Sequence, residues 1–145
     1  MQSAMTERIT HSEAETIQAG IRFAAELQAG DVIALIGDLG SGKTHFTKGI
    51  CKGLQIGDDI TSPTFVILNE YVDGRLPVYH FDFYRMKSLT ELDEIGFEEY
   101  LYRDGVCIIE WADMVAEKLP RRRYEIALRL GASHDDRIIT TRKIG

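Results

Sequence analysis

Eight consecutive residues in the first third of the chain match a pattern that binds phosphate. They run Gly-Asp-Leu-Gly-Ser-Gly-Lys-Thr from Gly37 to Thr44 and fit G-x-x-x-x-G-K-[ST] at every fixed position. The glycines allow the backbone to curl so that successive amides point at phosphate oxygens. In this pattern Lys43 binds the β- and γ-phosphates, and the Thr44 hydroxyl binds Mg²⁺. The loop amides come from the residues between, which are Asp38, Leu39, Gly40, Ser41 and Gly42.

The sequence on either side of this loop predicts the elements that the pattern requires. Residues 32–36 are continuously apolar, which is typical of a central strand covered on both faces. From residue 43 onward a helical stripe of apolar side chains is expected, formed by Phe46, Ile50 and Leu54. An ordinary glycine turn followed by a surface lysine is the alternative interpretation. A buried strand before the loop and a helix after it favour nucleotide binding instead.

A phosphate loop of this kind also needs a carboxylate for the metal, and two residues are candidates. Glu110 ends an apolar run that is expected to be a buried strand, and Asp82 lies on the polar face of another strand. A charge at the end of an apolar strand is costly unless it is solvated or paired with a cation. We assign Glu110 to the Mg²⁺ shell, and Asp82 to the orientation of the attacking water or to the metal network. The alternatives are a solvated strand end for Glu110 and a surface ion pair with Arg85 for Asp82.

Two further positions are candidates for contact with the nucleotide. The segment 61–64 is rich in hydroxyls, and Thr64 follows a stiffening proline, so we assign Thr64 to sensing of the γ-phosphate. Ordinary loop chemistry is the alternative for this segment. Trp111, the only tryptophan, directly follows Glu110. It is expected to cover the nucleotide, to face a partner or to lie at the rim of the core.

Other residues with chemical potential are more ambiguous. His80 shares the face of Asp82 and is read either as a structural histidine or as a base. The basic run 121–123 is read as a solvated surface, or as a contact for an acidic partner or an RNA phosphate. The four histidines and two cysteines show no zinc spacing. Cys51 and Cys107 lie in apolar surroundings and are expected to be reduced core thiols of a cytosolic protein.

The periodicity of the whole chain predicts one α/β domain over residues 1–145. A capping box at Ser12 and Glu15 opens a helix that Gly30 stops, and the turn Asp73-Gly74 joins a hairpin. The remaining elements are expected in these ranges: hairpin strands at 65–72 and 78–84, an acidic helical stretch at 88–100 broken by Gly96, a buried strand at 106–109, a short helix at 114–119, and closing strands at 124–130 and 137–141. The fold class is therefore a single P-loop NTPase-like domain with a mixed, mainly parallel central sheet flanked by helices.

Composition excludes several classes of protein. The 145 residues include 17 Lys and Arg against 23 Asp and Glu, which gives a net charge of −6. That balance disfavours a protein that holds nucleic acid mainly through its own basic surface. No apolar run approaches the roughly 18 residues of a membrane span, and the first residues lack the apolar stretch of a signal peptide. A cytoplasmic chain without membrane contact is expected.

Taken together and in this order, the motifs resemble the bacterial TsaE family, also called YjeE. The resemblance rests on the phosphate loop and on three later signatures, which are Ser62-Pro63-Thr64, His80-Phe81-Asp82-Phe83-Tyr84-Arg85 and Glu110-Trp111. It extends from about Ser12 to Leu130. It implies a small Mg²⁺-dependent ATPase required for threonylcarbamoyladenosine formation next to the anticodon of tRNA. Members of this family work with TsaD and TsaB, so tRNA is expected to be reached indirectly through that complex.

The resemblance also implies roles for single residues. Lys43 and Thr44 correspond to the phosphate and Mg²⁺ ligands, Glu110 to the metal site, Asp82 to the hydrolysis aspartate and Trp111 to the active-site tryptophan. Thr64 lies in the switch-like loop of the family. His45 departs from the family pattern, in which a small polar residue is usual at this position.

Three expectations remain open at the level of the sequence. Arg85 and Arg103 are candidates for an arginine finger, and without one the isolated protein is expected to hydrolyse ATP slowly. An acidic surface suits a basic protein partner and is formed by Glu91, Asp93, Glu94, Glu98 and Glu99. Two alternative functions are a small-molecule kinase, in which residues 121–123 would serve as a lid, and a non-catalytic module gated by nucleotide.

Overall fold

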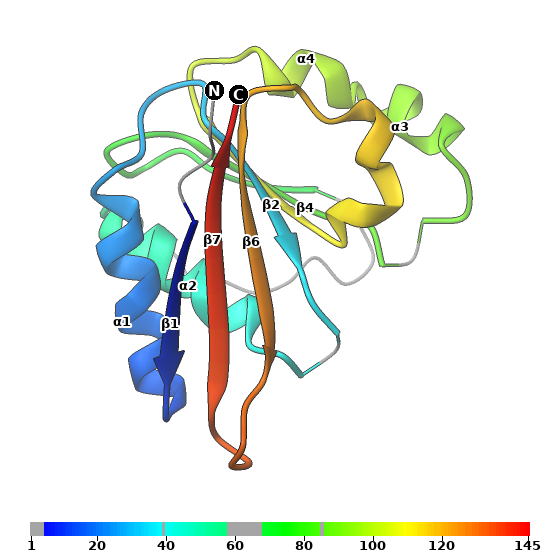
Figure 1. The fold of residues 1–145 in the computed structure, drawn as a ribbon. Helices are drawn as coiled ribbons and strands as arrows, with labels where there is room; N and C mark the ends of the chain where they lie inside the picture. The colour runs from blue at the N-terminus through cyan, green and yellow to red at the C-terminus, as the bar shows by residue number, and fades with distance from the viewer. Residues whose placement is uncertain (1–4, 39, 58–67, 85) are drawn as a thin grey trace.

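A computed structural model describes residues 5–38, 40–57, 68–84 and 86–145 of the chain. Its centre is a seven-stranded sheet with the order β1-β7-β6-β2-β5-β4-β3 (Figure 1). The strands are β1 (Met5–Thr10), β2 (Val32–Ile36), β3 (Leu68–Tyr71), β4 (Val78–Asp82), β5 (Val106–Glu110), β6 (Arg123–Leu130) and β7 (Arg137–Ile144).

The middle of the sheet is parallel and both of its edges are antiparallel. Strand β2 pairs in parallel with β5 and β6, and β5 pairs in parallel with β4. The outer pairings of β3 with β4, β6 with β7, and β1 with β7 are antiparallel. The sheet is therefore mixed with a parallel centre, and the carboxyl ends of β2, β4 and β5 meet at one edge, where open α/β sheets bind their ligands.

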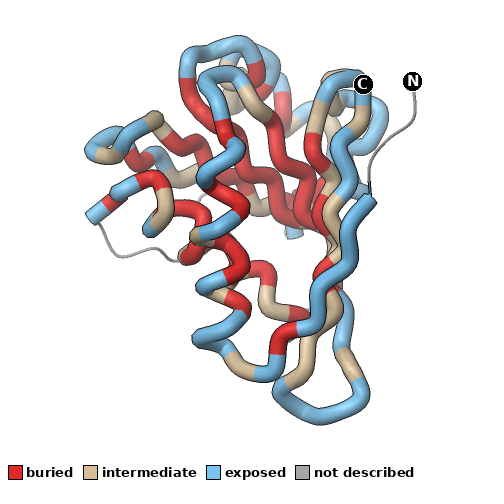
Figure 2. Tube along the Cα trace, turned by 60° about the vertical axis from the view of Figure 1, so that its left-hand side comes forward, coloured by how far each residue is buried: buried red, intermediate tan, exposed pale blue. Residues whose placement is uncertain are grey.

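Helices cover both faces of the sheet. One face carries α1 (Glu13–Ala24) and α2 (Lys43–Gly53), and the other carries α3 (Thr90–Ile95), α4 (Phe97–Leu101) and the 3₁₀ helix η1 (Ala112–Lys118) (Figure 1). Each face has its own apolar cluster, one containing Phe46 and Ile108, the other Phe97 and Ile109. Because the central strands are covered twice, they are buried along their length (Figure 2).

The two helices on the first face pack closely because glycines meet between them. A Cβ atom on Gly49 would lie 2.0 Å from the carbonyl oxygen of Ile17, and one on Gly20 would lie 2.4 Å from that of Phe46. Helix α1 is thereby held against α2, and its first turn comes near the phosphate loop. An ideal Cβ on Gly42 would be 3.6 Å from Cγ2 of Thr16.

Most elements lie where the sequence predicts them, with a few differences. Ser12 caps α1 by accepting from the Glu15 amide, at 3.1 Å, but the helix ends at Ala24 instead of reaching Gly30. The acidic stretch is broken at Gly96 into α3 and α4 as predicted. The strand β1 was not expected, and the short helix before Pro120 begins earlier, at Ala112, and is 3₁₀. Residues 65–67 of the predicted hairpin lie outside the described residues.

Candidate functional site

The phosphate loop lies between β2 and α2, as its sequence requires. Gly42 precedes the helix in a left-handed conformation, with φ at 102°, and Lys43 is the first helical residue. Gly37 has no room for a side chain, because a Cβ there would lie 2.5 Å from the carbonyl oxygen of Leu128 and 2.7 Å from Oγ of Ser41. The loop therefore presents backbone at the positive end of an 11-residue helix, which is a favourable place for an anion.

The Lys43 side chain is turned onto groups of the protein itself. Its ammonium donates to the carbonyl oxygen of Gly37 and lies 3.5 Å from the centroid of the Trp111 ring. Burial lowers the pKa of this ammonium, and the nearby carboxylates of Glu110 and Asp82 oppose that shift. The amine is thus held partly desolvated beside two acids, which is where a cation for phosphate groups is expected.

Side-chain alternation brings the two candidate carboxylates to the same face as the loop helix. Tyr79, Phe81 and Phe83 pack together on the α3 side, as predicted. Asp82 therefore points to the α2 side, and it stands directly opposite Glu110 in the parallel register of β4 and β5. The two acids end adjacent strands at the edge from which the phosphate loop also starts.

Glu110 is buried and paired instead of being a solvated strand end. Its residue surface is 2% exposed, and its Oε2 lies 2.5 Å from Nε2 of His80, which is fully buried. The other ring nitrogen of His80, Nδ1, is buried without a hydrogen-bond partner. His80 thus fixes the position of a proposed metal ligand, which is the kind of support that second partners give to ligating carboxylates.

Asp82 is half-buried and lies where it can take up a proton. Burial raises the pKa of its carboxyl and the neighbouring Glu110 adds to this shift, whereas a hydrogen bond from the Tyr84 amide to Oδ1, 3.0 Å long, lowers it. Shifts of this origin are typical of functional carboxyls. The predicted alternative, an ion pair with Arg85, involves a residue outside the described ones.

Trp111 closes this side of the site in an uncommon backbone conformation. Its φ of 60° is left-handed, which is rare for a bulky residue and is often found at functional positions. The indole packs against Tyr84 in a tilted arrangement, with the ring centroids 4.9 Å apart, and the Lys43 ammonium also lies over the indole. Of the three roles expected for Trp111, this placement favours the one in which the ring covers a nucleotide at the phosphate loop.

The structure brings together most of the predicted residues. Lys43, Asp82, Glu110 and Trp111 converge at the loop, and Thr44 occupies the first turn of α2. Asp38 and Gly40 form the exposed side of the loop, whereas Ser41 is buried. Two predicted nucleotide contacts, Leu39 and Thr64, lie outside the described residues.

Two predicted roles are wrong because the residues lie at the edge of the sheet opposite the phosphate loop. Arg103 precedes β5 and therefore lies at the edge opposite Glu110, where its guanidinium packs 4.0 Å from the Tyr100 ring centroid, so it is no arginine finger in this chain. The basic run 121–123 leads into β6 at the same far edge and cannot serve as a lid over the loop. Both corrections follow from strand direction, which neither motif reveals.

Sequence reasoning missed two groups near the loop. Asp113, in η1, contributes to the field around Lys43, and only the turn after Glu110 brings it there. His80 was read as either structural or a base, and its contact with Glu110 was not foreseen. The only signal for that contact in the sequence is that each residue is a polar side chain within or at the end of an apolar strand.

Features of the site fit a nucleoside triphosphate with Mg²⁺. Oγ of Ser41 is buried in the loop without a hydrogen-bond partner, so a phosphate oxygen would satisfy it. The described residues contain no group of three or more His, Cys, Asp or Glu able to hold a metal by themselves. One hydroxyl from Thr44 and one carboxylate from Glu110 suit Mg²⁺, which takes its remaining ligands from phosphates and water.

A model of one protein family, described as threonylcarbamoyl adenosine biosynthesis protein TsaE, matches residues 10–140. The chain belongs to the TsaE family. The match spans β2, the phosphate loop and both carboxylate-bearing strands, so the site lies wholly within the TsaE region.

Known TsaE proteins and one solved structure resemble the chain over most of its length. A tRNA threonylcarbamoyladenosine biosynthesis protein TsaE from Bacillus subtilis is 48% identical over 122 residues, which are 84% of this chain and 75% of the relative. The TsaE of Treponema pallidum is 43% identical over 122 residues, or 84% of this chain and 90% of the relative. The crystal structure of Bacillus subtilis YdiB superposes with a TM-score of 0.83 at 39% identity, covering 100% of this chain and 89% of that one.

The helices of the described part of the chain were also compared with the requirements of a bilayer. None of them combines the length and the hydropathy that crossing a membrane requires.

Proposed function

We propose that this TsaE-family chain is a Mg²⁺-dependent ATPase that acts in the formation of threonylcarbamoyladenosine on tRNA. The observation that carries the proposal is the convergence of Lys43, Asp82 and Glu110 at the end of β2, beside a loop that presents backbone amides at a helix N-terminus. The names of the relatives supply the biosynthetic role. ATP as the nucleotide rests on the resemblance to the family.

Each residue has a distinct task in this proposal. Lys43 leaves Gly37 and Trp111 to bind the β- and γ-phosphates, and the loop amides with Ser41 bind the remaining oxygens. Thr44 and Glu110 hold Mg²⁺, which when bound neutralises charge on the transferred phosphoryl group. Asp82, which the Tyr84 amide orients, positions the attacking water and accepts its proton.

The isolated chain is expected to turn over slowly. Arg103 lies at the wrong edge. Arg137 lies beside the loop, because its Cγ would be 3.7 Å from a Cβ on Gly42, but its guanidinium donates to the carbonyl oxygens of His134 and Asp136, so neither residue is placed as an arginine finger. In P-loop hydrolases without such a cation, turnover is slow until a partner supplies one or orders the site. We therefore propose that TsaD and TsaB stimulate hydrolysis, and that the protein works with them in the cytoplasm and reaches tRNA through that complex.

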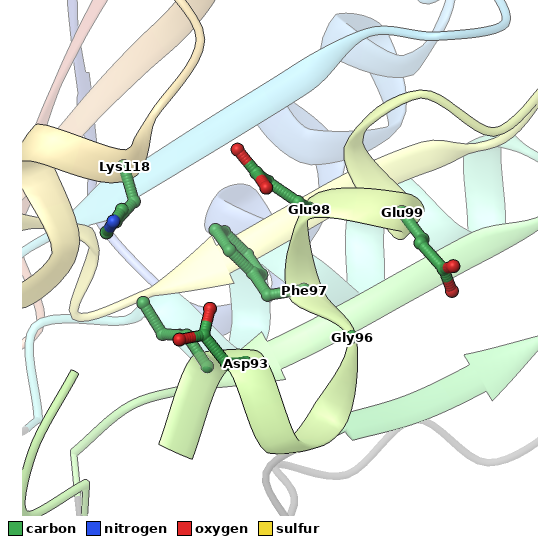
Figure 3. A pocket seen from close by; sticks show the side chains of 7 residues that line it. Asp93, Gly96, Phe97, Glu98, Glu99 and Lys118 are labelled. Carbon is green, nitrogen blue, oxygen red and sulfur yellow. The ribbon is translucent and has the colours of Figure 1, made fainter. Parts of the chain in front are cut away.

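An acidic surface on α3 and α4 suits a basic partner. A cavity of about 260 Å³ opens between α3, α4 and η1 and is lined in part by Asp93, Glu98, Glu99 and Lys118 around Phe97 (Figure 3). Because three of these groups are carboxylates and one is a cation, the rim carries excess negative charge. Such a rim favours a partner with a positive surface and accelerates its association.

The test is steady-state ATP hydrolysis with and without purified TsaD and TsaB. We expect slow turnover alone and a marked rise when both partners are added, with Lys43→Ala inactive in both conditions. If turnover stays at its slow basal rate at every partner concentration, the proposed stimulation by TsaD and TsaB is wrong. If there is no turnover in any condition while calorimetry shows ATP binding, the chain is a nucleotide-gated module instead of an ATPase. If calorimetry shows no ATP binding, the assignment of the phosphate site is wrong.

A further inference from the structure

A second concave site lies at the edge of the sheet opposite the phosphate loop. A cavity of about 290 Å³ is bounded by the segment before β2, the end of α4, the start of β6 and the end of β7. These four segments meet because the amino ends of the parallel strands β2 and β6 lie at the same edge. The volume is close to the lower end of the range for pockets that bind small ligands, about 300–1000 Å³.

Positive charge gathers in this cavity although the chain as a whole is acidic. Arg122, Arg123 and Lys143 line it, and Arg121 precedes them on the exposed surface. Arg123 is engaged, because its guanidinium donates to Glu125 at 2.6 and 3.1 Å and to the Pro120 carbonyl at 3.1 Å. Among the described residues, Arg122 and Lys143 form no ion pair with a carboxylate. Both cations therefore lack a carboxylate partner, and the Lys143 ammonium lies 5.5 Å from the centroid of the Tyr124 ring.

One carboxylate also lines the cavity and offsets part of this charge. Asp31 accepts a hydrogen bond from the Gln28 amide at 2.8 Å, which holds it in its own turn and leaves the lining with more cations than anions. Lys143 lies on β7 and pairs with Tyr124 in the register of β6 and β7, and Arg122 is the exposed residue directly before β6. The cavity is thus a concave site with a net positive lining at the end of the sheet.

An exposed aromatic ring completes the lining. Tyr102 follows α4, and its residue surface is 79% exposed, the most of the large apolar and aromatic residues described. Tyr100, in the same helix, packs against Phe81 and Tyr79, so the ring of Tyr102 is the one left for a ligand. An exposed aromatic next to cations is the combination with which proteins hold an unstacked base and its phosphate.

We propose that this cavity binds one unpaired nucleotide of an RNA, with a phosphate at its positive lining and the base stacked on Tyr102. The ring favours RNA over an acidic peptide, because carboxylates need cations only, whereas a base needs a flat apolar surface. The site lies at the edge of the sheet opposite the phosphate loop, so RNA binding there is independent of ATP binding. This adds a direct contact to the indirect route through partner proteins.

The experiment measures fluorescence anisotropy of a labelled, unmodified tRNA transcript titrated with the full chain at several salt concentrations. Arg122→Glu with Lys143→Glu is expected to abolish binding at low salt. Arg122→Gln with Lys143→Gln is expected to lower the slope of log K against log salt by about 0.7, because one phosphate contact of a single strand is lost. Tyr102→Ala is expected to weaken binding about 5- to 150-fold, and Tyr102→Phe to leave it unchanged.

The matched control reverses two cations elsewhere. Arg8→Glu with Arg22→Glu changes the net charge by the same amount at another cavity, and it should bind RNA as the wild type does. Thermal unfolding of every variant verifies folding, and ATP hydrolysis should be unchanged by all of them.

Four results would overturn the proposal. The first three are an absence of tRNA binding by the wild type at low salt, equal losses in the two charge-reversed pairs, and full binding by Tyr102→Ala. The fourth comes from a parallel titration with poly-glutamate, in which the wild type binds poly-glutamate and the charge-reversed cavity binds only tRNA. The last of these would assign the cavity to an acidic protein.

Discussion

The Lys43 ammonium lies 3.5 Å from the centroid of the Trp111 ring and donates to the Gly37 carbonyl at the same time. A cation over an indole face is attracted by the ring quadrupole, and the attraction is strongest when both groups are partly desolvated. The ammonium that should bind phosphate is therefore occupied by two groups of the protein. Nucleotide binding has to replace both contacts, so the indole reports on the occupancy of the loop.

The first prediction uses this coupling. Addition of ATP with Mg²⁺ should change the fluorescence of Trp111, which is the only tryptophan, because Lys43 leaves the ring when it binds phosphate. Lys43→Ala should give no nucleotide-dependent change, and Trp111→Phe controls for inner-filter effects. Unchanged emission in a wild-type sample that calorimetry shows to be saturated would contradict the exchange of contacts.

The second prediction uses one variant to separate two effects of Asp82, which are its destabilisation of the folded protein and its role in hydrolysis. Because the pKa of Asp82 is raised in the folded protein, the folded state binds more protons than the unfolded state between the two pKa values, and stability falls as the pH rises through that window. At neutral pH Asp82→Asn should therefore keep or raise the melting temperature, since an amide oxygen still accepts from the Tyr84 amide. Turnover should fall about 10²-fold or more.

The same variant tests the pH dependence. In the wild type the acid limb of kcat/KM should lie above the pKa of an ordinary aspartate, about 3.9, because Asp82 has to be ionised to accept a proton. The residual activity of Asp82→Asn should lack that limb. An identical profile in both proteins would return Asp82 to a structural role.

The third prediction concerns the buried contact between His80 and Glu110. His80→Leu removes a hydrogen-bond partner from a buried carboxyl group and should lower the free energy of unfolding by about 1–3 kcal/mol. His80→Gln carries a side-chain amide that can donate to Glu110 and should recover part of the loss. The Mg²⁺ concentration needed for half-maximal hydrolysis should rise in His80→Leu more than in His80→Gln, because Glu110 loses its orientation.

Urea denaturation and metal titration of the two variants decide between positioning and packing. If both variants are equally destabilised and share the wild-type Mg²⁺ requirement, His80 serves the core alone.

The parts of the molecule that the sequence predicts are those fixed by local pattern. The phosphate loop, β2 and α2 follow from spacing within one segment, and Gly96 marks the break between α3 and α4. The alternation in β4 correctly places Phe81 and Phe83 on one face. Each of these features depends on residues that are neighbours along the chain.

The parts that were missed depend on neighbours in space. Strand β1 carries mostly exposed side chains and is held by backbone pairing with β7, so it has no apolar face to recognise. The contact between His80 and Glu110 requires β4 beside β5 in parallel register, and the exclusion of Arg103 requires the direction of β5. Strand order and direction are set by the packing of the whole sheet and not by either motif.

The final prediction tests the close approach of the two helices that flank the phosphate loop. In an isolated helix Gly49→Ala would be stabilising by about 0.5–1 kcal/mol, because glycine loses more backbone entropy on folding. Here the new Cβ would lie 2.0 Å from the Ile17 carbonyl oxygen, which is backbone and cannot rotate away. Urea denaturation should therefore show a loss of about 1–3 kcal/mol, the usual cost of overpacking.

Lys52→Ala, at an exposed position of the same helix, is the matched control and should change stability by no more than about 0.5 kcal/mol. Since the first turn of α1 lies beside the loop at Gly42, Gly49→Ala should also weaken ATP binding. A variant at position 49 that is as stable as the wild type would mean that α1 does not pack on α2 at this distance, and that the position of α1 beside the loop has to be revised.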